Sequence, residues 1–85
     1  ILILDEPTRG IDVNTKKEIY HFIRTLTEQG VSVIVISSEL EEVMGLSNRV
    51  MVMRSGEIMG ELTGDAINEK EIMYYAAGLK SMNRA

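Results

Sequence analysis

The feature that most constrains this chain is a pair of short apolar runs separated by one amphipathic stretch of helical length. The runs are ILIL at residues 1–4 and VSVIVI at residues 31–36, and the second is rich in β-branched residues. A continuous apolar run is typical of a strand buried on both faces of a parallel sheet. Strand, helix and strand of these lengths predict a right-handed βαβ unit with parallel strands.

The stretch between the runs predicts a helix that begins after Asp12, as its N-cap, and ends near Gln29. Gly30 follows as the stop signal, because glycine tolerates the left-handed conformation that ends many helices. The apolar residues recur at helical spacing and predict one buried stripe. Its members are Ile19, Phe22, Ile23 and Leu26.

A second, shorter helix is predicted after the second strand. Ser38 followed by Glu41 matches the capping-box pattern, with Ser38 as N-cap and Glu41 at the third helical position. The helix is expected to end near Gly45 and to place its apolar residues on one face. These residues are Leu40, Val43 and Met44.

The remaining residues predict a β-hairpin and a last helix. The runs 50–53 and 57–62 flank Ser55-Gly56, a two-residue turn typical of antiparallel hairpins. Asn68 is expected to cap the helix, and residues after 79 to form a frayed tail. The expected buried residues are Ile72, Tyr75, Ala76 and Leu79 on this helix and Met51, Met53 and Met59 on the strands.

Composition restricts the classes of function. The 85 residues include no cysteine, which excludes disulfides and thiolate metal sites, and the net charge of −4 offers no general attraction for nucleic acid. Charged residues interrupt the apolar ones too often for a membrane span, and no signal peptide is present. We therefore expect a soluble, cytoplasmic chain. Because it opens inside an apolar run without an initiator Met, we also expect it to be cut from a longer parent.

Two carboxylates stand where an α/β sheet usually binds its ligand. Asp5 and Glu6 come directly after the first apolar run, and ligands lie beyond the carboxyl ends of such strands. Phosphoryl transfer to water requires a divalent metal and a group that orients the attacking water. Asp5 is suited to hold Mg²⁺ through coordinated water, since Mg²⁺ rarely sheds its full hydration shell, and Glu6 would orient the nucleophile.

The order of motifs resembles the second half of an ABC transporter nucleotide-binding domain. LDEPT at residues 4–8 is followed by GID at 10–12, a helix, VIVISSE at 33–39 and a hairpin. The resemblance implies an α/β fold, a truncated P-loop NTPase (RecA-like) core. Residues 1–54 would form the partial core, and residues 55–85 the hairpin and C-terminal helix. Residues 1–6 correspond to the Walker B strand, 9–12 to the D-loop, and Ser38 to the switch histidine.

A finer resemblance is to the ATPase subunits of ribose- and galactoside-type sugar importers, in particular to their second ATPase half. DEPTRGID at residues 5–12 and ISSEL at 36–40 carry it. It implies ATP and Mg²⁺ as cofactors of a full-length ATP hydrolase coupled to sugar import. Glu6 and Ser38 take the catalytic positions, Asp5 the metal position, and Gly10 and Asp12 the D-loop positions at the dimer interface.

Three family elements are missing from these 85 residues: the Gly-rich Lys-Ser/Thr loop, the Q-loop and the signature motif. Backbone amides and a lysine of that loop supply most of the grip on the phosphates, so the chain alone is expected to be inactive and free of nucleotide. The resemblance implies permease subunits and a second nucleotide-binding half as partners, at the inner face of the membrane. The resemblance also implies that a central strand of the sheet is missing from these residues. Its absence would leave unpaired strand edges and an exposed apolar face, which favour self-association.

Some residues allow a simpler interpretation. The capping pattern is a sufficient explanation for Ser38, because serine lacks the charge of the switch histidine; this half would then hydrolyse ATP poorly. His21 is expected on the helix surface. Arg9 is either a solvated loop charge or a contact to a partner domain. Asp12 serves as a helix cap, and the family role at the dimer interface is compatible with that.

Two other functions stay open at this point. The chain could be a non-catalytic interaction module that docks through its apolar edges, in which case the acidic pair would carry no function. It could also be part of a non-transport ABC ATPase of DNA repair or chromosome architecture. Such proteins normally keep the switch histidine, and the acidic balance provides no basic patch for a duplex.

Overall fold

The structure, a computed structural model, describes residues 1–79. Its contacts divide the chain into two compact units, Ile1–Leu46 and a second that begins at Ser47, and each is described by itself. The first contains two strands and two helices; the second contains a hairpin and a helix. The α/β class, with a parallel pair followed by an antiparallel hairpin and a C-terminal helix, is confirmed.

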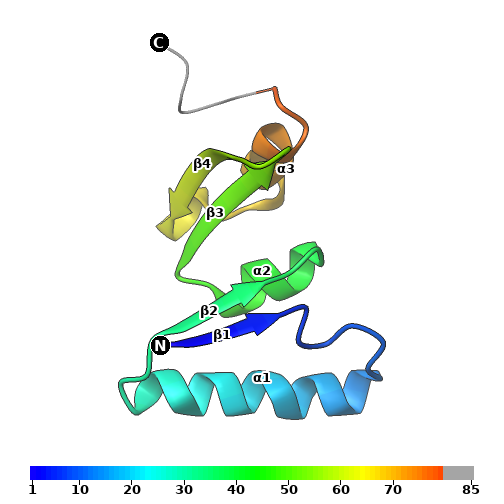
Figure 1. The fold of residues 1–85 in the computed structure, drawn as a ribbon, viewed down its shortest axis with the longest axis vertical. Coiled ribbons are helices and arrows are strands. Elements are labelled where there is room, and N and C mark those ends of the chain that lie inside the picture. The colour runs from blue at the N-terminus through cyan, green and yellow to red at the C-terminus, as the bar shows by residue number, and fades with distance from the viewer. Residues whose placement is uncertain (80–85) are drawn as a thin grey trace. The chain divides into compact units, whose positions relative to one another are not determined.

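In the first unit, strands β1 (Leu2–Asp5) and β2 (Val33–Ile36) pair in parallel. The register sets Leu2 opposite Val33 and Asp5 opposite Ile36, so both strands end at the same edge. Helix α1 (Val13–Glu28) connects them and runs along one side of the pair, as Figure 1 shows. The predicted strand–helix–strand unit with parallel strands is therefore confirmed.

The predicted ends of α1 are also confirmed. The carboxylate of Asp12 accepts a hydrogen bond from the Thr15 amide at 2.9 Å, which satisfies one of the free donors of the first turn. Gly30 follows the helix with φ of 89°, a left-handed value that favours glycine. Ile23 is buried, but Phe22 is 57% exposed, so its predicted place in the stripe is wrong. Because α1 covers only one face of the sheet, the buried apolar stripe along the helix is narrower than the sequence predicts.

The two strands are not buried on both faces, contrary to the expectation from their apolar runs. Exposure alternates along each strand, with Leu2, Leu4, Val33 and Val35 half-buried on one face. On the other face Ile3, Ile34 and Ile36 are 61%, 51% and 50% exposed. Residues 1–46 supply only one long helix to cover the pair, so the second face stays open.

The start of helix α2 (Leu40–Leu46) differs from the predicted one. The Ser37 hydroxyl, not that of Ser38, accepts the Glu39 amide at 3.0 Å, and the Glu39 carbonyl accepts the Val43 amide. The bond from the Glu39 amide to Ser37 spans two residues and closes a local turn before the helix, and Glu39, not Ser38, directly precedes the first helical residue. The capping box between Ser38 and Glu41 is therefore wrong, and the buried residue of the helix is Glu42.

The second unit contains the predicted hairpin. Strands β3 (Arg49–Arg54) and β4 (Glu57–Thr63) are antiparallel, and a bulge lies between Val52 and Met53. Ser55 and Gly56 have φ of 51° and 80°, as a two-residue hairpin turn requires. The short 3-10 helix η1 (Gly64–Ala66) leads to α3 (Glu69–Ala76), and Asn68 accepts the Glu71 amide as its cap.

The small core of this unit consists of Val50, Val52, Leu62 and Ile72. Two predicted core methionines, Met51 and Met53, are 48% and 62% exposed, because the strand presents its valines to α3 and the intervening residues to the opposite face. On α3, Ile72 is buried and Tyr75 half-buried as predicted, but Ala76 and Leu79 are exposed. The helix ends at Ala76, so Leu79 lies beyond its stripe. The predicted frayed tail lies outside the described residues.

Gly60 on β4 is required by the ring of Tyr75. A Cβ at this position would stand 2.6 Å from two ring carbons, closer than real contacts allow. We expect Gly60→Ala to destabilise the protein by about 1–3 kcal/mol, the usual cost of overpacking a filled site. Denaturant unfolding measures the difference.

Gly45→Ala on α2 is the matched control, since a Cβ there meets no atom within 4 Å and the backbone is helical. This variant should be neutral or more stable by up to about 1 kcal/mol. Equal effects of the two substitutions would contradict the close packing of Gly60 and Tyr75.

Candidate functional site

The candidate site lies at the edge where both parallel strands end. Asp5 is the last residue of β1, and its partner Ile36 is the last of β2. The Glu6 amide donates to the Ile36 carbonyl at 2.7 Å, so the pairing continues one residue beyond the strand. Ser38 follows Ile36 by two residues. Asp5, Glu6 and Ser38 therefore leave neighbouring strands at the same edge, where parallel sheets bind ligands.

The backbone at Glu6 adopts an unusual conformation. Its φ of 47° lies in the left-handed region, which costs a non-glycine residue about 1–2 kcal/mol. The Arg9 amide donates to the Glu6 carbonyl at 3.2 Å, and together these features turn the chain sharply after the strand. Asp5 is exposed, whereas Glu6 is half-buried. Strained backbone of this kind is concentrated at functional sites.

The loop after Glu6 ends at the start of α1. Gly10 has φ of 73° and is exposed, as is Arg9. Asp12 caps the helix, and the hydrogen bond from the Thr15 amide is the main reason that the pKa of its carboxyl is lowered. The structure thus confirms the capping role of Asp12. His21, on the exposed side of α1, is at the surface as expected.

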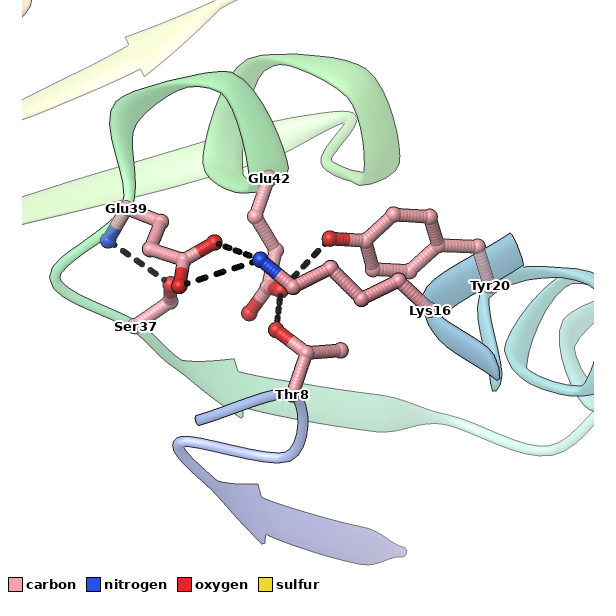
Figure 2. Close-up of polar contacts among 6 residues, drawn as sticks. All are labelled: Thr8, Lys16, Tyr20, Ser37, Glu39 and Glu42. Carbon is pink, nitrogen blue, oxygen red and sulfur yellow. Dashed lines mark hydrogen bonds and ion pairs between the residues drawn. The ribbon is translucent and has the colours of Figure 1, made fainter. Parts of the chain in front are cut away.

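A buried cluster that the sequence did not reveal lies behind this loop. Thr8, only 1% exposed, donates its hydroxyl to the Glu42 carboxylate, and Tyr20 donates to the same oxygen at 2.8 Å. Figure 2 shows the three side chains converging from the loop, α1 and α2. Glu42 itself is 3% exposed. Its position on an amphipathic helix gave no signal, because glutamates there usually face water.

The Glu42 carboxylate is held in its charged form. Burial by itself raises the pKa of a carboxyl, but the hydrogen bonds from the Thr8 and Tyr20 hydroxyls outweigh it, and the nearby Ser37 hydroxyl and Lys16 ammonium add to their effect. The net result is a pKa of Glu42 below the ordinary value. Conversely, burial and the bond to Glu42 raise the pKa of the Tyr20 hydroxyl.

An ion pair flanks the cluster. The Lys16 ammonium lies 3.2 Å from Oε2 of Glu39, which directly precedes α2, and this contact raises the pKa of Lys16. Figure 2 shows the Lys16 side chain crossing from α1 toward Glu39. Both side chains are partly exposed, so the pair contributes little to stability and mainly favours one position of α2 relative to α1.

Within residues 1–79, no group of three or more acidic or histidine side chains is arranged to bind a metal ion by itself. Asp5 supplies a single exposed carboxylate, which fits an ion that keeps most of its water. None of the helices in that part of the chain is both long and apolar enough to cross a membrane.

Comparison with known proteins identifies close relatives, although no protein-family model matches the chain. It is 62% identical over 78 residues to the ribose import ATP-binding protein RbsA of Hahella chejuensis, and 54% identical to that of Oceanobacillus iheyensis. A putative ribose/galactose/methyl galactoside import ATP-binding protein of Halalkalibacterium halodurans is 50% identical over 82 residues. These matches cover 92% to 96% of the chain but only 16% of each relative.

The charged state of Glu42 predicts how stability depends on pH. Because its pKa is lower in the folded protein, its contribution is complete above the unfolded value near 4.5 and is lost as the pH falls through the folded value. We expect Glu42→Gln to destabilise the protein at pH 7 by about 1–3 kcal/mol. We also expect this cost to shrink at lower pH, as measured by denaturant unfolding.

Glu41→Gln, on the exposed side of the same helix, is the control and should leave both stability and its pH dependence close to those of the wild type. A constant difference between Glu42→Gln and the wild type across this pH range would contradict the depressed pKa.

Proposed function

Because the chain is homologous over more than nine-tenths of its length to the ATP-binding proteins of ribose-type ABC importers, we propose that it supplies the Walker B strand, D-loop and switch segment of such a protein. In this proposal β1 and Glu6 form the Walker B element, residues 9–12 the D-loop, and Ser38 the switch position. The function is ATP hydrolysis that drives the import of a sugar.

The observation that carries the proposal is the arrangement of the two carboxylates at the sheet edge. Asp5 is the exposed last residue of β1, while Glu6 follows with a left-handed backbone and is half-buried. Two neighbouring carboxylates in such different surroundings can serve two functions at once. Asp5 would hold Mg²⁺ through water and Glu6 would orient the attacking water, the two tasks that phosphoryl transfer requires.

The Mg²⁺ ion, when bound with ATP, would neutralise charge on the phosphates. The lone exposed Asp5 fits an ion held mainly by water and phosphate oxygens. Ser38 would donate a hydrogen bond to the γ-phosphate, a weaker interaction than a charged histidine makes. Gly10 and Asp12 would face a second nucleotide-binding half across the dimer interface.

The 85 residues alone are proposed to lack ATPase activity, since no Gly-rich lysine loop is present to grip the phosphates. Permease subunits would hold the complete protein at the inner face of the membrane. The open face formed by Ile3, Ile34 and Ile36 would make the isolated chain self-associate, which sedimentation of the 85 residues can test. A stable monomer would contradict that part of the proposal.

Glu6→Gln in the full-length protein tests the proposed function. Glutamine has the same size as glutamate, but its amide cannot accept a proton from water. ATP turnover should therefore fall at least about 100-fold. ATP binding should persist, because the phosphates are held by other groups. Steady-state hydrolysis and nucleotide binding measure the two effects separately.

Glu18→Gln, on the exposed surface of α1, is the matched control and should turn over ATP at the wild-type rate. The purified 85-residue chain provides the blank, with no turnover expected. Undiminished turnover of Glu6→Gln would refute the role of Glu6, provided that the other ATPase half has been inactivated in both proteins.

A further test concerns the residue at the switch position. If the serine limits the reaction, Ser38→His in the full-length protein should raise the rate of ATP hydrolysis, because a histidine can stabilise charge on the γ-phosphate. The substitution should not disturb the start of α2, since Ser38 is exposed and the turn before the helix is closed by the Ser37 hydroxyl. An unchanged or lower rate would show that Ser38 does not limit this site.

A further inference from the structure

The proposed function leaves the buried Glu42 cluster unused. We propose that Glu42 is a positioning residue that fixes the loop after Glu6 relative to the segment that carries Ser38. ATP turnover would then depend on Glu42 although its side chain touches no nucleotide. This inference rests on the proposed function.

The first step connects Glu42 to the catalytic turn. Thr8 follows Glu6 by two residues and is almost completely buried, and its hydroxyl donates to the Glu42 carboxylate. Within the same turn, the Arg9 amide donates to the Glu6 carbonyl. The bond from Thr8 to Glu42 therefore anchors the turn whose left-handed first residue is Glu6.

The second step connects Glu42 to the switch segment. Ser38 stands between Ser37 and Glu39, and these two neighbours are bound to each other through the Ser37 hydroxyl and the Glu39 amide. The Glu39 carbonyl accepts the Val43 amide in the first turn of α2. Since Glu42 belongs to the same turn, an anchor on Glu42 also sets the position of Ser38.

The third step is the contribution of α1. This helix begins at Asp12, where the loop ends, and its Tyr20 hydroxyl donates to the same Glu42 oxygen at 2.8 Å. Lys16, one turn earlier on α1, forms an ion pair with Glu39. The loop of residues 7–12 is thus tied to α2 both through Thr8 and through the helix that follows it.

A carboxylate suits this position because it can accept several hydrogen bonds at once without competing as a donor. Removing it would leave the buried Thr8 hydroxyl and the half-buried Tyr20 hydroxyl without their acceptor, and the loop would gain freedom. A displacement of about 1 Å at a catalytic group can cost roughly 100-fold in rate. Loosening of the cluster should therefore reduce kcat more than it weakens nucleotide binding.

The test compares two substitutions of Thr8 in the full-length protein. Thr8→Ser keeps the hydroxyl and loses a methyl group, whereas Thr8→Val keeps the shape and loses the hydroxyl. We expect Thr8→Val to lower kcat roughly 10-fold or more and Thr8→Ser to stay near the wild type. Binding of a non-hydrolysable ATP analogue should change little in either, and Tm is recorded for all variants.

Glu42→Gln and the double variant Thr8→Val/Glu42→Gln complete the design. If both residues act through one contact, the double variant should lose no more activity than the more affected single variant. Glu41→Gln serves as the control, with unchanged kcat. If Glu42→Gln does not fold, the Thr8 pair still decides the question.

Three outcomes would overturn the inference. If kcat follows Tm alone, or if Thr8→Val retains full kcat while Glu6→Gln abolishes it, the cluster is structural and only the positioning role fails. If the wild-type protein neither binds nor hydrolyses ATP, the proposed function itself fails and the positioning role fails with it.

Discussion

The first unit depends on one buried carboxylate. Glu42 lies on the helix that follows β2. It accepts hydrogen bonds from a hydroxyl in the loop after β1 and from a hydroxyl on α1. Burying a charge is costly unless hydrogen bonds compensate for it, so these contacts specify a narrow arrangement rather than adding much net stability. Three segments that are far apart in the sequence thereby take defined positions around the edge of the sheet.

That edge brings the candidate catalytic groups together. Parallel pairing aligns the ends of β1 and β2, and the left-handed backbone of Glu6 turns the chain directly after Asp5. In the same unit, Ile3, Ile34 and Ile36 are exposed on the face of the strands that α1 does not cover. An apolar surface of this kind is typical of an interaction face. The chain spans only 16% of the length of the ribose import ATP-binding protein of Hahella chejuensis.

Local signals predicted much of this structure. Asp12 and Asn68 cap their helices as expected, and Ser55-Gly56 forms the hairpin turn, because each depends on bonds between near neighbours. Apart from the capping box predicted at Ser38, the errors concern which side of an element is buried. Phe22 and Met53 are exposed although their apolar character predicts otherwise, since burial depends on which covering layer is present.

The sequence by itself determined the order of elements, most of their caps and turns, and the position of the acidic pair after the first strand. These properties follow from local backbone preferences and from the spacing of apolar residues. Only the tertiary structure decided that Glu42 is buried and that it accepts hydrogen bonds from Thr8 and Tyr20. Those contacts depend on the distance between segments in space, which no local pattern encodes.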